Sequence, residues 1–236
     1  MSKNRMQTIK TLSGSTLKII AVISMLIDHT AAVLVSPYDF SMLYTIMRLI
    51  GRLAFPIFCF LLVEGIHYTS NVKKYLFQLG IFAILSEIPF DLAFHHRIYD
   101  DRYQNVFFTL FLGALLIYIM EQLKHNTSPY TNLKKGICIF VICSIAFFLK
   151  TDYGYKGIIL ILCYYFLYQT SYIKLIAAAV VIFLLYGFSL EIAAVFSGIP
   201  IACYNGKRGL KLKYIFYLFY PVHLLILFFI KMSFFP

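Results

Sequence analysis

Residues 17–35 have the sequence LKIIAVISMLIDHTAAVLV, an apolar stretch that carries the adjacent polar pair Asp28-His29 near its middle. A helix crosses the hydrocarbon core of a bilayer in roughly 20 residues. A charged side chain near the centre of that core costs about 2.5–3.5 kcal/mol, so it is found where it is paired or functional. The stretch therefore predicts a membrane helix whose polar pair needs partners inside the bilayer.

The rest of the 236-residue chain has the same character, with 61% hydrophobic and 13% charged residues. A soluble domain carries roughly 25% charged residues. Further apolar stretches lie at 43–67, 75–94, 105–123, 136–149, 155–169, 171–186, 190–203 and 213–231. We predict an all-α, polytopic transmembrane helix bundle of about nine helices in a single domain. The alternative is eight spans plus a re-entrant segment near 187–203, where Gly187 and the run Ser197-Gly198-Ile199-Pro200 interrupt the pattern.

The formal net charge of +11 is concentrated in the loops between these stretches. Thirteen basic residues fall on one predicted side: Lys3, Arg5, Lys10, Lys18, Lys73, Lys74, Lys124, Lys134, Lys135, Lys207, Arg208, Lys211 and Lys213. Five fall on the other side: Arg97, Arg102, Lys150, Lys156 and Lys231. This bias sets membrane orientation, so we expect a multi-pass cell-membrane protein with a cytoplasmic N-terminus. We therefore expect the lipid bilayer, and not a nucleic acid, to be the partner of these basic residues.

Ionisable residues from four predicted helices lie at a similar depth. Counting about 1.5 Å per residue from the predicted helix ends places them roughly 13–18 Å into the membrane. The residues are Asp28, His29, Arg52, Glu87 and His223. Such a set must be paired or solvated in an enclosed chamber, and it indicates a functional site within the membrane.

Charged side chains at this depth can pair in two ways. Arg52 is the expected partner of Asp28, because it lies at comparable depth on the next helix. Arg48 and Arg52 are four residues apart and share a helix face, and the same holds for Glu87 and Asp91. The arginines therefore suit an anionic ligand or these two carboxylates. These side chains therefore have two interpretations: a structural ion pair, or a direct role in the functional site.

Three further polar positions have a functional and a structural interpretation. His29 suggests a general base, the alternative being a ring that donates to a backbone carbonyl. His223 follows Pro221, and a proline inside a helix can free a nearby carbonyl. Glu64 lies near the cytoplasmic end of the second predicted span, where a charged side chain reaches the interface, so a structural role is expected there.

Residues 204–209, with the sequence YNGKRG, combine turn glycines with positive charge. They form either a topology-setting loop or a loop that binds the phosphates of a cytoplasmic cofactor. The sequence contains no Walker loop, GxGxxG, GxSxG or HExxH motif. The spacing of cysteines and histidines predicts no metal site.

Several motifs together resemble the TraX family of membrane proteins. They are LKIIA at 17–21, LIDH at 26–29, RLIGRLAFPIF at 48–58, LLVEG at 61–65, SEIPFD at 86–91, QNVFFTL at 104–110, YNGKRG at 204–209 and FYPVH at 219–223. The family is named for a conjugation protein that N-acetylates the pilin subunit. It is similar, more distantly, to membrane acyltransferases that modify sugars and cell-wall polymers. Those relatives carry a basic residue and a histidine eleven positions apart; here Lys18, in place of the more usual arginine, and His29 have this spacing.

The resemblance implies one transmembrane acyltransferase-like domain over residues 1–236. It would transfer an acyl group, most simply acetyl, from cytoplasmic acyl-CoA to an amine or hydroxyl. The acceptor would be a protein N-terminus, a peptide or a cell-envelope sugar. His29 would be a general base or a transient acyl carrier, and the implied catalytic set is His29, Asp28, Glu87 and His223. The implied acetyl-CoA-binding set is Arg48, Arg52, Asn205, Lys207 and Arg208.

Two other functions use the same residues. Mid-membrane carboxylates and histidines also suit a proton-coupled transporter or flippase. Alternatively, the charges fix the helices of a structural or assembly protein.

Overall fold

The computed structural model describes residues 10–124, 128–170, 172–210 and 213–234, and within these ranges the regular elements are helices. Lys3, Arg5 and Lys211, which entered the count of basic residues, lie outside the described residues. The helices are α1 (Gly14–Leu34), α2 (Ser41–Gly51), α3 (Ala54–Tyr68), α4 (Val72–Leu85), α5 (Glu87–His95), α6 (Val106–Lys124), α7 (Thr131–Phe148), α8 (Gly154–Phe166), α9 (Ile173–Tyr186), the 3₁₀ helix η1 (Leu190–Ser197), α10 (Gly198–Ala202) and α11 (Lys213–Phe234).

Six helical stretches are long and apolar enough to cross a membrane: Gly14–Leu34, Ser41–Tyr68, Val72–His95, Val106–Lys124, Thr131–Phe148 and Tyr214–Phe234. Three shorter apolar stretches follow α7: Gly154–Phe166, Ile173–Tyr186 and Leu190–Ala202. These stretches coincide in position with the predicted spans. The all-helical membrane bundle is therefore supported, with six spans of full length in the described part of the chain.

Two of the long stretches are broken, each close to a proline. The second divides into α2 and α3 at residues 52–53, and the third divides into α4 and α5 at Ser86. Pro56 and Pro89 have no N–H to donate to the carbonyl four residues earlier, so the regular ladder stops there. The breaks leave Arg52 and Glu87 at helix junctions.

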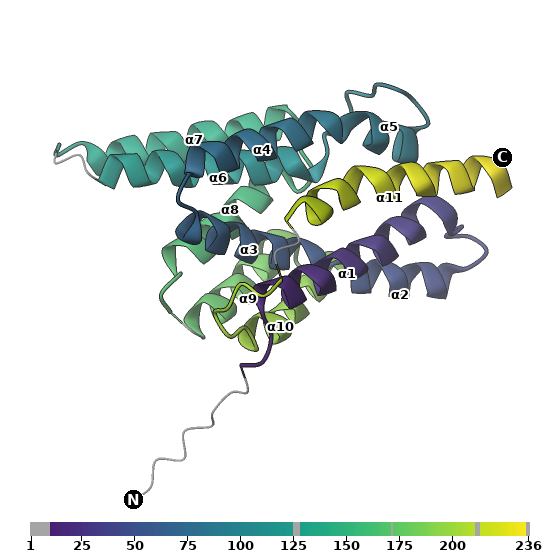
Figure 1. The fold of residues 1–236 in the computed structure, drawn as a ribbon, viewed down its shortest axis with the longest axis horizontal. Coiled ribbons are helices and arrows are strands. Elements are labelled where there is room, and N and C mark those ends of the chain that lie inside the picture. Colours follow the sequence, from purple (N-terminus) through teal and green to yellow (C-terminus); the bar gives the residue numbers. More distant parts are fainter. Residues whose placement is uncertain (1–9, 125–127, 171, 211–212, 235–236) are drawn as a thin grey trace, which may run out of the picture.

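The loops gather at two ends of the bundle (Figure 1). At the first, which we call the basic end, residues 10–15 pair with residues 203–208. The N–H groups of Gly14 and Ser15 donate to the carbonyls of Lys207 and Arg208 at 2.8 and 2.9 Å. These bonds satisfy N–H groups that the first turn of α1 leaves unpaired. At the second, which we call the opposite end, Gln104 donates from its N–H to the carbonyl of Lys150 at 3.1 Å.

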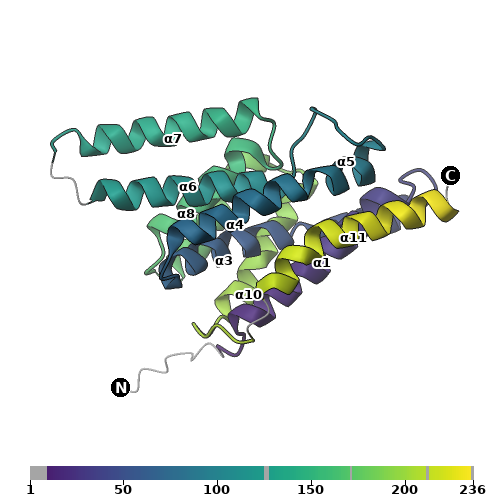
Figure 2. The same ribbon diagram turned by 45° about the horizontal axis from the view of Figure 1, so that its top comes forward.

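Helices α1 and α11 run side by side, with α5 against α11 and with α2 and α3 against α1 (Figures 1 and 2). Helices α6 and α7 form a layer on the side of α3 and α4 that faces away from α1 (Figure 2). Large apolar side chains point outward from α7, where Phe140 and Phe148 are 73% and 77% exposed. Such a surface suits contact with lipid chains rather than water. His29 of α1 and His223 of α11 instead face each other inside the bundle.

Candidate functional site

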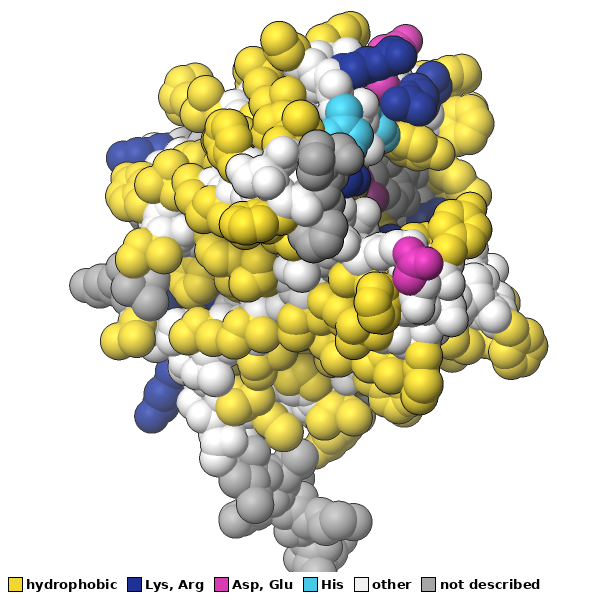
Figure 3. Space-filling view, turned by 90° about the vertical axis from the view of Figure 1, so that its right-hand side faces the viewer, with side chains coloured by type: hydrophobic (Ala, Val, Ile, Leu, Met, Phe, Trp, Pro, Cys, Tyr) yellow, Lys and Arg dark blue, Asp and Glu magenta, His cyan; other side chains and the backbone are white. Residues whose placement is uncertain are grey.

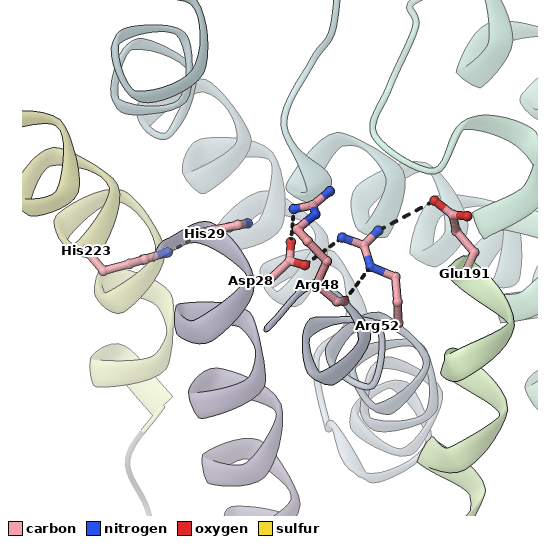
Figure 4. Close-up of polar contacts among 6 residues, drawn as sticks. All are labelled: Asp28, His29, Arg48, Arg52, Glu191 and His223. Atoms are coloured by element: carbon pink, nitrogen blue, oxygen red, sulfur yellow. Dashed lines mark hydrogen bonds and ion pairs between the residues drawn. The ribbon is translucent and has the colours of Figure 1, made fainter. Parts of the chain in front are cut away.

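Asp28 lies between two arginines. Its Oδ2 accepts a hydrogen bond from Nη1 of Arg48 at 2.7 Å, and its Oδ1 accepts one from Nη2 of Arg52 at 2.6 Å (Figure 4). Nη1 of Arg52 also lies 3.9 Å from Oε1 of Glu191. The predicted Asp28–Arg52 pair is confirmed, and Arg48 joins it because residues four apart share a helix face. This ion-pair network connects α1, the α2–α3 junction and η1.

The close approach of α1 and α2 depends on Gly51. A Cβ added at Gly51 would lie 2.2 Å from Oδ1 of Asp28. Glycine is therefore required at this contact, because any larger residue would displace the carboxylate from the arginines. Glu191, which sequence reasoning did not identify, enters the network from the segment that was considered as a re-entrant alternative.

His29 and His223 form a second polar group on the other face of α1 (Figure 4). Nδ1 of His29 lies 2.7 Å from Nε2 of His223, and Nδ1 of His223 lies 2.7 Å from the carbonyl oxygen of Phe219. A carbonyl only accepts, so Nδ1 of His223 carries a hydrogen. With both rings neutral, Nε2 of His223 is then an acceptor and Nδ1 of His29 donates to it. This tautomer leaves the lone pair on Nε2 of His29.

The two histidine rings are stacked in an aromatic setting. Their centroids are 5.0 Å apart at an interplanar angle of 6°, and the His29 ring also meets Phe94 and Tyr220 edge-on. Tyr220, which is 3% exposed, contacts both histidine rings. The carbonyl that holds His223 belongs to Phe219. Pro221 has no N–H to donate to the carbonyl of Tyr217, four residues earlier, so the carbonyl that holds His223 is a different one.

A cavity of about 540 Å³ opens at the basic end and extends toward the histidine pair. Its polar lining includes Lys18, Glu64, Tyr68, Ser70, Tyr204 and Arg208, and its inner lining includes Met25, Leu79, Val106, Phe107 and Tyr220. Met25 precedes His29 by one helical turn, and Tyr220 contacts both histidines. The cavity therefore ends one layer of side chains away from His29.

Of the residues predicted to bind a CoA donor, Arg208 lines this cavity. Asn205 is used within the loop, because its Nδ2 donates to the carbonyl of Thr11 at 3.3 Å and its Oδ1 accepts from the N–H of Lys207 at 2.8 Å. Neither Asn205 nor Lys207 lines the cavity. Lys18, eleven residues before His29, does.

Glu87 and Asp91 do not pair with the arginines, so this alternative, which the sequence left open, does not form. Oε2 of Glu87 accepts hydrogen bonds from the backbone and the side chain of Asn105. Oδ2 of Asp91 accepts one from the N–H of Asp100 at 2.9 Å. Among the described residues, Oε1 of Glu87 and Oδ1 of Asp91 are buried without a partner. Both residues lie on α5, which contacts α4, α11 and α1.

Two acidic residues of the structure were misjudged or missed in the sequence. Glu64 lies near the end of α3, as predicted, but it is buried, with 7% exposure, and accepts a hydrogen bond from the hydroxyl of Tyr204 at 3.0 Å, so its burial inside the protein was not predicted. Asp152, in the loop between α7 and α8, lies near the arginine pair. Burial raises the pKa of Asp152 to about 6, even though the nearby charge of Arg52 opposes this shift. A loop acid gives no signal in a hydropathy pattern.

The opposite end also carries charged side chains. In Figure 3 the surface is mostly hydrophobic, with basic and acidic side chains gathered around a hollow. Arg48 remains 24% exposed although it is paired with Asp28. Part of Arg48 therefore remains accessible at the protein surface, while the cavity approaches the histidines from the basic end.

The sequence model of the TraX protein family matches residues 13–231. The chain belongs to the TraX family. This match covers the ion-pair network, the histidine pair and the described lining of the large cavity. The expected family membership is thus confirmed over nearly the whole chain.

Two relatives of this TraX-family chain are informative. The chain is 32% identical to the "Probable fimbrial assembly protein FimC, serogroup H1" of Dichelobacter nodosus, over 91% of this chain and 94% of that protein. It is 29% identical to an uncharacterized protein of Rickettsia prowazekii (strain Madrid E), over 58% of this chain and 49% of that protein. No solved structure matches the chain.

Proposed function

We propose that this chain is a membrane-embedded acyltransferase that moves an acyl group, most simply acetyl, from cytoplasmic acyl-CoA to an amine or hydroxyl. The observation that carries the proposal is the histidine pair at the inner end of the large cavity. The hydrogen bonds to His223 and Phe219 orient His29 so that Nε2 presents a lone pair. A positioned neutral imidazole is the most common general base in proteins.

In the proposed reaction, the acceptor nitrogen or oxygen attacks the thioester carbonyl while Nε2 of His29 takes the acceptor's proton. The new C–N or C–O bond forms, the C–S bond breaks, and the CoA thiolate recovers the proton from His29. The imidazolium that forms on His29 keeps its Nδ1–H bond to Nε2 of His223 throughout. His223 thus acts as a positioning residue. Alternatively, His29 itself attacks and carries the acyl group to the acceptor.

The cavity supports an elongated donor. Its lining follows α1 from Gly14 to Met25, a rise of about 16 Å at 1.5 Å per residue. Cationic side chains, Lys18 and Arg208, lie toward the basic end, while Met25 and Tyr220 lie toward the histidines. A donor with phosphates at one end and a thioester at the other matches this order. Tyr220 must move aside for the thioester to reach His29.

The network of Asp28, Arg48 and Arg52 is assigned a positioning role. It fixes the segment of α1 that carries His29, and its guanidinium groups add positive potential beside the site. Glu87, whose Oε2 is held by Asn105 and whose Oε1 has no partner among the described residues, is retained as a protonatable group.

The acceptor is proposed to reach His29 from the opposite end. The excess of basic residues at the basic end favours a cytoplasmic position for that end in the cell membrane. Donor and acceptor would then meet from opposite sides of the bilayer. The fimbrial assembly name of the Dichelobacter nodosus relative favours a protein N-terminus over a peptide or a cell-envelope sugar as the acceptor class.

Purified protein in detergent, supplied with radiolabelled acetyl-CoA and candidate acceptors, tests the proposal. His29→Ala is expected to reduce acetyl transfer at least about 100-fold, the contribution of a general base. His67→Ala is the matched control, because His67 is an exposed histidine of α3 that does not line the cavity. Normal turnover in His29→Ala would remove His29 from the mechanism.

A proton-coupled transporter is the second candidate. The buried, unpartnered oxygens of Glu87 and Asp91 favour it, because such carboxyls can carry protons. Uptake of substrate into proteoliposomes under a pH gradient, abolished by Glu87→Gln and unaffected by His29→Ala, would establish it in place of acyl transfer.

A further inference from the structure

The cavity has two chemically different sides at the basic end. Lys18 and Arg208 supply positive charge, whereas Glu64 supplies a carboxylate flanked by Tyr68 and Tyr204. The cationic pair suits phosphates, but a buried carboxylate repels them. The acidic side therefore suits a different part of the ligand, one that donates hydrogen bonds.

Glu64 is held in place by the loop that also carries Arg208. The hydroxyl of Tyr204 donates to Oε2 of Glu64 at 3.0 Å, and the N–H of the next residue, Asn205, donates to the carbonyl of Leu12 at 2.9 Å. Burial and the negative charge of Glu64 raise the pKa of Tyr204, so its hydroxyl stays protonated and keeps donating. The carboxylate is consequently fixed in the cavity wall at a constant position relative to the loop.

Tyr68 completes the acidic side with a free aromatic surface. It lies at the last position of α3, one helical turn after Glu64, and is 69% exposed. An exposed aromatic ring beside a buried carboxylate is a combination that binds a planar base, which stacks on the ring and donates an amino hydrogen to the carboxylate.

We propose that Glu64 and Tyr68 bind the adenine ring of the acyl-CoA donor while Lys18 and Arg208 bind its phosphates. This inference rests on the proposed use of acyl-CoA and names the residues that select a donor carrying a nucleotide. The carboxylate of Glu64 accepts from the 6-amino group of adenine. A carboxylate has no hydrogen to donate, so it discriminates against a base with a 6-oxo group.

Equilibrium binding in detergent tests this subsite with three probes: CoA, 4′-phosphopantetheine, which lacks the nucleotide, and CoA with hypoxanthine in place of adenine. We expect the wild-type protein to bind CoA at least about tenfold more tightly than either analogue, as expected for loss of a charge-assisted hydrogen bond. Glu64→Gln should weaken CoA binding about tenfold and leave 4′-phosphopantetheine binding unchanged.

Glu121→Gln is the matched control, because it makes the same substitution at a glutamate of α6 that does not line the cavity. We expect it to retain the preference for adenine over hypoxanthine. Equal affinity of the wild-type protein for CoA and hypoxanthine-CoA would overturn the subsite even if Glu64→Gln failed to fold. If Glu64→Gln weakened the binding of CoA and of 4′-phosphopantetheine equally, the carboxylate of Glu64 would be purely structural. If the wild-type protein bound no CoA at all, the proposed donor would fail together with the subsite.

Discussion

Replacing Asp28 with asparagine removes the charge that Arg48 and Arg52 share. The two hydrogen bonds are 2.7 and 2.6 Å long, and the side chains of Arg52 and Asp28 are 10% and 11% exposed. Breaking a buried ion pair by removing one partner costs about 3–5 kcal/mol. Arg48 is 24% exposed and Glu191 lies 3.9 Å from Arg52, so both arginines keep some compensation. We therefore expect a loss near the lower limit, about 3 kcal/mol.

The assay is thermal unfolding of the purified protein in detergent. For a chain of this size, about 3 kcal/mol corresponds to a Tm decrease of roughly 6–12 °C. Asp39→Asn is the matched control, because the same substitution in an exposed loop should change stability by less than about 0.5 kcal/mol. If Asp28→Asn unfolded at the same temperature as Asp39→Asn, the network would not hold α1 against α2, and the reasoning would fail.

Two other predictions concern packing and pH. Gly51→Ala should destabilise the protein by about 1–3 kcal/mol in the same assay, because its Cβ would lie 2.2 Å from Asp28; Gly136→Ala, whose Cβ meets nothing within 4 Å, should not. Asp152 has a folded pKa of about 6, above its unfolded value of about 3.9, so the folded state binds the extra proton between these values. Its contribution to stability should fall by about 2 kcal/mol as pH rises from 4 to 6, and Asp152→Asn should lack this slope; equal pH profiles of variant and wild type would contradict the assignment.

The positions of the helices were accessible from the sequence because each apolar stretch has a strong hydropathy signal. The junctions at residues 52–53 and 86 were not predicted. Pro56 and Pro89 are visible in the sequence, but membrane helices often tolerate proline, so its presence does not determine a break. Glu87 is held by Asn105 and Asp91 by the N–H of Asp100, so the pairing with the arginines that the sequence allowed does not form.

The depth of each residue, counted from the predicted end of its helix, indicated that Asp28 and Arg52 would meet and that His29 and His223 would lie at one level. It did not predict that the histidines would bond to each other, since depth along a helix gives no information on which helices are neighbours. Glu64 was predicted to lie near the cytoplasmic end of its span, but its burial inside the protein was not predicted. Tyr204, which buries its carboxylate, lies 140 residues away and carries no charge to reveal the contact.

A density map of the protein incubated with acetyl-CoA tests the central claim most directly. The account predicts that the donor occupies the large cavity, with its phosphates beside Lys18 and Arg208, Tyr220 displaced, and the acetyl carbonyl within reach of Nε2 of His29. Acetyl-CoA bound elsewhere, or a thioester separated from His29 by an undisturbed Tyr220 ring, would contradict it.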